Sequence, residues 1–373
     1  MNTETKTGGR LGSLDALRGF DMFFITGGAA AIAGAAAACG SPDGWLAVQM
    51  RHVEWAGLAH HDTIFPLFLF LAGVSWPLSL ASRRARGLST LQIQAKIALR
   101  TVVLFLLGLS FGGILKFDPG FRLAGVLQFI GLSWGVAATC SLHVRRKGAL
   151  ALVAAALLAG YGCLLHFFAA PGAPADAWTY SVEWNIVSWL DKAVYGAHMV
   201  AGWGYEPESF FSLPSGVALA LIGMLAGDCL KDGVASRGRR TVLMLALAGV
   251  AALALTCVLV WGCGVPVVKK LWTVTFVLAA ASYSLLMLAL FVYVVDVLAL
   301  RRWTFLFDCV GKNSILAYML MMTGVSSVLQ RYLFTGLCEA TGAWQKAFAG
   351  LTSYLVVWGL LRYLGRKGVY LRA

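Results

Sequence analysis

The sequence predicts an all-α fold, a polytopic integral membrane helical bundle with about ten transmembrane helices. Of the 373 residues, 59% are hydrophobic and only 13% are charged, and the mean hydropathy is +0.77. A water-soluble domain of this size could hardly stay in solution with that balance, so lipid is the expected solvent for most of its surface. The apolar residues also gather in runs near the ~20 residues that about 30 Å of hydrocarbon requires.

The apolar runs define the predicted spans in chain order. They cover residues 14–38, 62–82, 97–115, 121–142, 148–170, 210–230, 241–262, 271–295, 304–328 and 347–364. No linker divides them into two membrane domains. We therefore expect a single transmembrane domain over residues 1–373, with one extended external loop at residues 171–209.

Basic residues between the runs predict the orientation. If the amino terminus is inside, about 21 Lys and Arg fall inside or at inner helix ends and about 8 outside. This asymmetry predicts a multi-pass protein of the inner (plasma) membrane with both termini cytoplasmic. The clusters that carry it are Arg83, Arg84, Arg86, Arg145, Arg146, Lys147, Arg237, Arg239, Arg240, Arg301, Arg302, Arg366 and Lys367.

The net charge of +13 does not indicate nucleic-acid binding, because the Lys and Arg form no continuous basic face.

The polar amino terminus leads into an apolar stretch interrupted by Asp15, Arg18 and Asp21. It therefore lacks the uninterrupted apolar region of a cleaved signal peptide, and the first helix is expected to stay in the mature protein.

Cysteine and histidine spacing gives no familiar metal site. The eight Cys are scattered, mostly inside apolar runs, and are interpreted as small apolar side chains. His52, Glu54, His60 and His61 gather in one stretch, and a metal site there is an alternative. Their spacing fits no usual ligand pattern, so no metal is expected.

The first span carries Asp15 and Arg18 three residues apart, on one helix face near its cytoplasmic end. A charge costs ~2.5 to 3.5 kcal/mol at a helix centre and less near an interface. One interpretation is a structural ion pair that also anchors the helix. The other is that Arg18 faces an anionic ligand that enters from the cytoplasm.

The segment from the first outer loop into the second span gathers His52, His61 and Asp62, and Pro66 follows within the helix. Histidine is the side chain best suited to take a proton near neutral pH. Pro66 removes a helix hydrogen bond where a cavity wall could open. His52 is therefore a candidate general base, although it could also be a satisfied interfacial residue.

Further polar residues within or beside spans predict a polar cavity, since such residues normally face a bundle interior.

The 171–209 loop combines acidic and aromatic side chains, as in a sugar-binding surface or an interfacial tryptophan belt. The loop residues are Asp176, Glu183, Asp191, Glu206 and Glu208, with Trp178, Trp184, Trp189 and Trp203.

Together these segments resemble the heparan-α-glucosaminide N-acetyltransferase family and its bacterial relatives, and the match follows the whole chain in order. The short Leu-Asp-x-x-Arg-Gly element is shared with other membrane acyltransferases, whereas the His-Trp-Gly-Asp-Phe-Pro string is specific. The motifs are Leu14-Asp15-x-x-Arg18-Gly19, His52-x-x-Trp55-x-Gly57-x4-Asp62-x-x-Phe65-Pro66, Gly125-Val-Leu-Gln128, Leu271-Trp272-Thr273 and Gly311-x-Asn313-Ser314.

The resemblance implies that acetyl-CoA binds from the cytoplasmic side and that its acetyl group reaches the amine of an amino sugar outside. His52 matches the family's catalytic histidine. Asp62 is expected to fix its tautomer, and Asn313 is a candidate oxyanion donor. The expected cosubstrate-binding residues are Asp15, Arg18, Arg100, Gln128, Lys269, Trp272, Lys312 and Ser314.

The expected cosubstrate-binding residues contact different parts of the ligand. Arg18 and Arg100 are expected to hold the CoA phosphates, and Gln128 is expected to contact the pantetheine arm. Lys312, as a buried lysine, is expected to bind an anion or a carbonyl oxygen. Ala29 and Val268 depart from residues common in the family.

Two mechanisms remain open for His52, which could act as a base or carry the acetyl group itself. The alternative function is an amino-sugar transporter without chemistry, and a homodimer is suggested by the resemblance alone.

Overall fold

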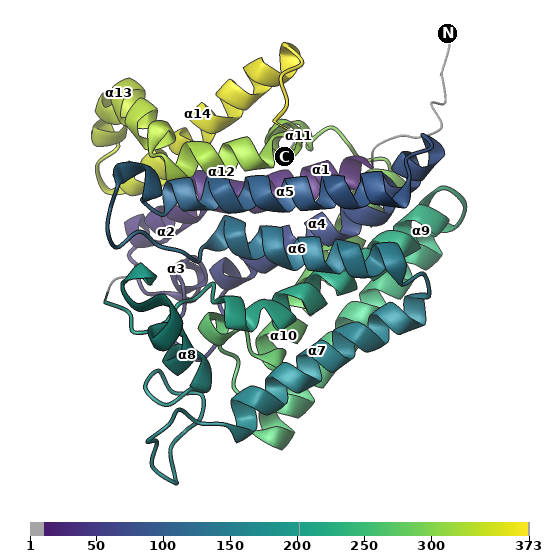
Figure 1. Cartoon of the computed structure of the whole chain (residues 1–373). Coiled ribbons are helices and arrows are strands. Elements are labelled where there is room, and N and C mark those ends of the chain that lie inside the picture. Colours follow the sequence, from purple (N-terminus) through teal and green to yellow (C-terminus); the bar gives the residue numbers. More distant parts are fainter. Residues whose placement is uncertain (1–10, 201, 372–373) are drawn as a thin grey trace.

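The computed structural model describes residues 11–200 and 202–371, with the side chains of residues 232–237 also left undescribed. The polar amino terminus, residues 1–10, and the side chain of Arg237 therefore lie outside the described part. Long helices run side by side across the molecule, and the described residues contain isolated β-bridges but no named strand (Figure 1). The predicted all-α fold is confirmed.

Nine helical segments of the described chain are long and apolar enough to cross a membrane, which confirms the predicted polytopic bundle. The first span combines α1 (Gly12–Phe23), the π-helical turn η1 (Phe24–Gly28) and α2 (Ala29–Ala38). The 3-10 turn η4 (Phe210–Ser212) and α9 (Leu213–Cys263) together form two spans, Phe210–Lys231 and Gly238–Cys263. The others are α4 (His60–Ala85), α5 (Thr90–Phe111), α6 (Val126–His143), α7 (Lys147–Phe167), α10 (Val274–Phe291) with η6 (Val292–Val297), and α14 (Gln345–Arg366).

The predicted span at 304–328 is not one continuous helix. It is divided into α11 (Phe305–Lys312) and α12 (Ser314–Met322), which meet at an angle of 81°. Asn313 between them has φ −125° and ψ 36°, which is not helical. A further helix that the apolar runs did not predict, α13 (Val325–Ala340), follows before α14. The described part of the chain therefore forms up to ten spans, one of them broken.

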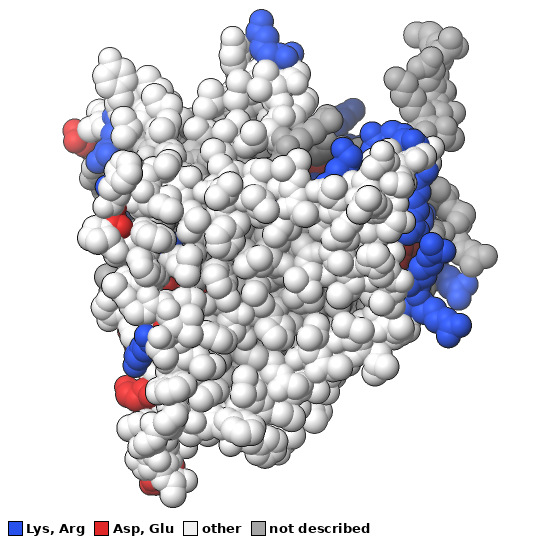
Figure 2. Space-filling model, in the orientation of Figure 1, with Lys and Arg blue, Asp and Glu red and all other residues white. Residues whose placement is uncertain are grey.

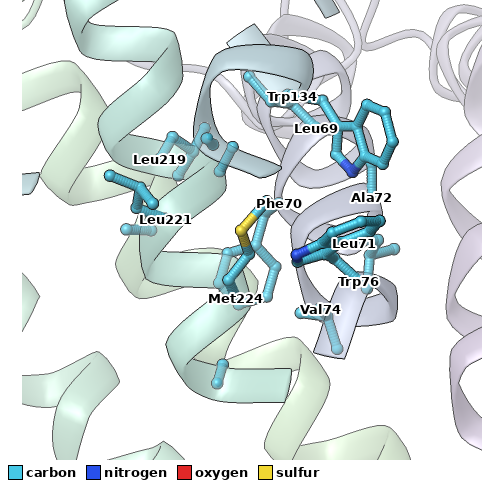
Figure 3. Close-up of a cluster of buried hydrophobic side chains, with 14 of the residues drawn as sticks. Leu69, Phe70, Leu71, Ala72, Val74, Trp76, Trp134, Leu219, Leu221 and Met224 are labelled. Carbon is cyan, nitrogen blue, oxygen red and sulfur yellow. The ribbon is translucent and has the colours of Figure 1, made fainter. Parts of the chain in front are cut away.

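Close packing of α4 against α9 forms the centre of the bundle. A Cβ added at Gly73 would lie 2.3 Å from the carbonyl oxygen of Ala220, and one at Gly223 would lie 2.3 Å from that of Phe70. Only glycine allows the two backbones to approach this far, as at other small-residue contacts between membrane helices. Figure 3 shows the surrounding side chains, where Met224 of α9 lies beside Phe70 of α4.

Charged side chains gather at the ends of the bundle. Figure 2 shows Lys and Arg concentrated at the end of the bundle on the right of the view. A broad surface free of charge separates this end from the end on the left. We call the end on the right the basic end. Such a band is what a lipid-facing surface requires, because ionised side chains are costly in hydrocarbon.

The opposite end carries the predicted 171–209 loop, which is partly helical. It contains α8 (Ile186–Tyr195) and the short 3-10 helix η3 (Gly196–His198). α8 begins at Asn185, whose Oδ1 accepts a hydrogen bond from the Ser188 backbone N at 2.6 Å. This is the usual N-cap, and it fixes a helix where the sequence predicted a loop surface.

Candidate active site

Two connecting segments, far apart in sequence, meet at the end of the bundle opposite the basic end. Residues 51–59 precede α4, and residues 264–273 connect α9 to α10. Ala56 and Val268 form an antiparallel bridge, and the Gly57 N donates to the Val267 O at 2.8 Å. Gly57 has φ +129°, a conformation that side chains rarely adopt. This junction places Lys269 beside His52.

His52, Asp62 and Lys269 form one polar cluster. The Asp62 Oδ1 lies 2.7 Å from the His52 Nδ1 and 3.2 Å from the Lys269 Nζ. The Asp62 Oδ2 accepts from the backbone N of Val53 at 3.3 Å and of Ala59 at 3.2 Å. Asp62 is the third residue of α4 and reaches back to the helix cap, where the helix dipole also favours a carboxylate. Both oxygens are therefore held in place.

The geometry assigns the tautomer of His52. A carboxylate only accepts hydrogen bonds and an ammonium only donates them. The Nδ1 of His52 is closer to Asp62 than to the Lys269 Nζ, which lies 3.0 Å away. The Nδ1 therefore carries the proton and donates it to Asp62, and Lys269 donates to the same carboxylate. The Nε2 of His52 is left free to accept a proton.

Lys269 adds a positive charge to this cluster at some cost. Burial lowers the pKa of its ammonium from the ordinary value, while the charges of Asp62 and Glu208 oppose that change. Its neighbour Lys270 donates to the Val53 O at 2.6 Å and holds the His52 segment against the α9–α10 connection. A positive donor next to His52 is suited to an oxygen that gains negative charge.

A cavity of about 350 Å³ opens at this cluster and extends between α1, α4, α5, α6 and α12. Its walls are mostly apolar, and His52, His61 and Lys269 lie on its polar side. Gln128 also lines it and donates to the Leu123 O at 3.2 Å. A Cβ at Gly108 would lie 1.9 Å from the Gln128 Oε1, so Gly108 makes room for that side chain.

An acidic group of the 171–209 loop lies at the same cavity. Arg122, just before α6, binds both Glu206 and Glu208, and Arg122 and Glu208 line the cavity. Burial disfavours the charge of Arg122, but the two carboxylates outweigh it and raise the pKa of the guanidinium. Asp191 is buried, accepts from the Ser209 Oγ at 2.6 Å, and has its pKa raised by burial to about 7.

The predicted acidic sugar surface is therefore divided. Asp191 and Glu206 are buried within the loop, whereas Glu208 faces the cavity. Trp178, Trp189 and Trp203 are about half exposed, as an interfacial belt requires.

A second polar group lies toward the basic end. Arg18 of α1 donates to the Ser75 Oγ and to the Leu71 O of α4, at 3.4 Å for the latter, and lies 3.6 Å from Asp15. Arg100 of α5 lies within electrostatic reach of Arg18 and Arg83. Three guanidinium groups thus converge from three helices.

Two tryptophans support these arginines. The Arg100 guanidinium lies 4.2 Å from the Trp134 ring centroid and that of Arg83 lies 5.7 Å from Trp76. Both indole N–H groups are buried and, like the Arg83 Nη1 and Arg100 Nε, have no hydrogen-bond partner among the described residues. Buried donors are normally satisfied, so this group of donors fits an anion with several acceptor oxygens.

The two polar groups lie along the same helices. Met22 and Phe68 line the cavity, and each lies about one helical turn from Arg18 or Leu71. From Asp62 to Ser75, α4 rises about 20 Å, a large part of the ~30 Å hydrocarbon layer. A long ligand could therefore hold an anionic end at the arginines and a reactive end at His52.

Several predicted site residues lie elsewhere. Asn313 is buried and occupied by the carboxyl-terminal segment, donating to the Val369 O at 3.1 Å and accepting from the Leu371 N at 2.9 Å. It does not line the cavity, so the structure does not place it with His52 and Asp62. Ser314 follows it at the start of α12 and also lies outside the cavity lining.

Two further residues that were expected to bind the cosubstrate also lie outside the cavity lining. Lys312 was predicted to be buried, but it is exposed at the end of α11, where the chain breaks before α12. Trp272 is 1% exposed and packs against Phe65, Phe129 and Phe276, which makes it part of the core beside the cluster. Of the departures from the family pattern, Val268 is fully buried.

Sequence reasoning missed two residues of these groups. Arg83 was assigned to the positive-inside signal, although its spacing of seven residues from Trp76 on one helix was visible. Glu208 was counted with the loop acids. For the metal alternative, the described residues contain no group of three or more His, Cys, Asp or Glu arranged to hold a metal ion.

The fold and the cluster define a class: a polytopic helical membrane protein with a His-Asp-Lys group at one end of an intramembrane cavity. No family model matches the chain. The chain is similar to the heparan-alpha-glucosaminide N-acetyltransferases of Mus musculus and Homo sapiens. The alignments cover 319 residues at 26% and 27% identity, with 72% of this chain and 48% of each relative. The chain thus spans about half the length of these relatives.

Proposed function

We propose that the protein is a membrane-bound acyltransferase that moves an acetyl group from cytoplasmic acetyl-CoA to the amine of an amino sugar on the external side. The observation that carries the proposal is the His52-Asp62 pair at a cavity, with Lys269 beside it. The similarity to two N-acetyltransferases supports the same reaction. We also infer that residues 1–373 form a single transmembrane domain, which carries this activity.

The amine nitrogen attacks the thioester carbonyl carbon, and a C–N bond forms. The Nε2 of His52 takes a proton from that nitrogen, and Asp62 stabilises the resulting imidazolium. Lys269 donates to the carbonyl oxygen as it becomes negative. The C–S bond then breaks, and the imidazolium returns its proton to the departing CoA thiolate. An acetyl group carried briefly on His52 is the covalent variant of this sequence.

The arginine group supports the binding of the cosubstrate. Arg18, Arg83 and Arg100 offer forked donors that match phosphate oxygens, with the indole N–H groups of Trp76 and Trp134 beside them. The pantetheine arm would then run along the apolar cavity past Gln128. Under this proposal the phosphates lie near the basic end and the thioester lies near His52.

The proposal requires that the basic end faces the cytoplasm. We expect reporters fused at the carboxyl terminus and in the α4–α5 loop around Arg84 to read cytoplasmic, and one near Asp176 to read external, because Lys and Arg concentrate at one end of the bundle. Reporter enzymes active on only one side of the membrane make the measurement. A cytoplasmic signal near Asp176 would contradict the orientation and the direction of transfer.

Arg18→Ala should weaken acetyl-CoA binding about ten-fold or more, because a charge-assisted hydrogen bond contributes about 1.5 to 3 kcal/mol. Acetyl-CoA at 100 times its Kd should stabilise the wild-type protein in detergent by about 2.7 kcal/mol. The apparent affinity is read from the shift in Tm with ligand concentration.

Arg84→Ala is the matched control, since Arg84 is exposed at the same end of α4. It should leave the affinity unchanged. An Arg18→Ala protein with wild-type affinity would make Arg18 only an anchor paired with Asp15. A wild-type protein that acetyl-CoA does not stabilise would contradict the enzyme and favour an amino-sugar transporter.

A further inference from the structure

At the cavity, one guanidinium is shared by two carboxylates. Arg122 is shared by Glu206 and Glu208, while Asp62 is matched by Lys269. The Nε of Arg122 donates to both carboxylate oxygens of Glu206, at 3.2 and 3.1 Å. Glu206 thus takes the forked pairing of the guanidinium, and Glu208 shares the Arg122 Nη2 with it.

The two glutamates differ in what else surrounds them. The Glu206 side chain is fully buried, accepts from the Val200 N at 3.2 Å, and belongs to the interior of the 171–209 loop. The Glu208 side chain is 10% exposed and lines the cavity together with His52 and Lys269. Glu208 and Lys269 border the same cavity, and the charge of Glu208 opposes the lowering of the Lys269 pKa by burial. Glu208 is therefore accessible from the space where the acceptor must lie.

We propose that Glu208 binds the protonated amine of the acceptor, and that it determines the preference for an amino sugar over a neutral sugar. This inference deepens the proposed function and depends on it for the identity of the acceptor. A primary ammonium is mostly excluded from an apolar cavity unless a carboxylate receives it. Glu208 supplies that carboxylate, while Asp62 is already occupied by His52 and Lys269.

The proton balance is consistent with this order. The ammonium bound at Glu208 loses one proton to water at the cavity mouth and becomes a neutral amine. After the C–N bond forms, the second proton passes to the His52 Nε2 and then to the CoA thiolate as the C–S bond breaks. One amide, one thiol and one released proton result. Glu208 exchanges no proton in these steps and is a specificity-determining residue.

The test measures binding of two probes that differ in one group, glucosamine and glucose, by calorimetry on the full chain in detergent. In wild-type protein, glucosamine should bind about ten-fold more tightly than glucose or better, because an ion-paired hydrogen bond replaces a neutral one. Glu208→Gln should reduce this preference to within about two-fold. Glu208→Asp, which keeps the charge, should recover part of it.

Glu183→Gln is the matched control, because Glu183 is an exposed acid of the same loop that does not line the cavity. It should keep the wild-type preference. Glu208→Gln should also raise the KM for glucosamine about ten-fold while the KM for acetyl-CoA stays within two-fold. Equal rises of both KM values would instead mean that Glu208 only holds Arg122 in place, and would overturn the inference.

The experiments distinguish a failure of the inference about Glu208 from a failure of the proposed acetyltransferase activity. If wild-type protein transfers acetyl groups but Glu208→Gln keeps the ten-fold preference, the inference about Glu208 is wrong and the enzyme remains. If wild-type protein prefers glucosamine, Glu208→Gln lacks this preference, and neither protein transfers acetyl groups, then the ammonium-binding role of Glu208 is supported and the acetyltransferase activity is contradicted. A wild-type protein that binds both sugars equally overturns the inference.

Discussion

His52→Ala should reduce the rate of acetyl transfer to glucosamine by about 10²- to 10⁴-fold, the usual contribution of a general base. Its Nε2 is the free acceptor of the cluster, because the Nδ1 donates to Asp62 at 2.7 Å. Acetyl-CoA binding should stay within a few-fold, because the arginine group toward the basic end is expected to hold the phosphates. Steady-state rates and the Tm shift with acetyl-CoA measure the two effects separately.

His166→Ala is the control for this experiment. His166 is exposed, lies at the end of α7 away from the cavity lining, and contacts the Tyr180 hydroxyl at 3.3 Å. It should keep the wild-type rate. If His52→Ala retains more than a tenth of the rate, the role must pass to His61, whose ring lies 4.6 Å from that of His52, or transport must replace chemistry.

The spans could be predicted because one physical rule controls them. A bilayer requires about 20 consecutive apolar residues, and this requirement is local in the sequence. The break at Asn313 and the helix α13 were not predicted, because a run of apolar residues does not say whether its backbone bends. That depends on tertiary contacts, here those of Asn313 with Val369 and Leu371.

The candidate site was predictable where its members are close in sequence. His52 and Asp62 are ten residues apart at a helix start, so their contact could be expected. Lys269 was assigned to cosubstrate binding, but its contact with His52 joins residues 217 positions apart. Asn313 was expected to be an oxyanion donor because it is a polar residue within a span, and in the structure it donates to the chain's own carboxyl-terminal segment.

Arg83 shows a different limit of sequence reasoning. Its charge already explained the membrane orientation, so nothing in the sequence required a second role. Only the structure shows that Arg100 of another helix lies within electrostatic reach of Arg83 and Arg18, with buried donors of Arg83 and Arg100 that have no hydrogen-bond partner among the described residues. The expectation of an anion follows from those donors.

Asp62→Asn is the second variant with a large expected effect, a loss of about 10²- to 10⁴-fold in kcat. The amide oxygen of Asn can keep the backbone hydrogen bonds from Val53 and Ala59, which now go to the Asp62 Oδ2. Its NH₂ group then faces the His52 Nδ1 and can only donate. The imidazole must place its proton on Nε2, so the free acceptor is lost, and the NH₂ also opposes Lys269.

The readouts are kcat for acetyl transfer and the Tm shift caused by acetyl-CoA, which should stay near the wild-type value because the arginine group is unchanged. Glu54→Gln is the matched control, since Glu54 is an exposed carboxylate of the same segment, and it should keep kcat. A similar loss in Glu54→Gln would point to the overall charge of the segment. An Asp62→Asn protein with more than a tenth of the wild-type kcat would show that the tautomer of His52 does not control the reaction, and the acid-base assignment would have to move to another group at the cavity.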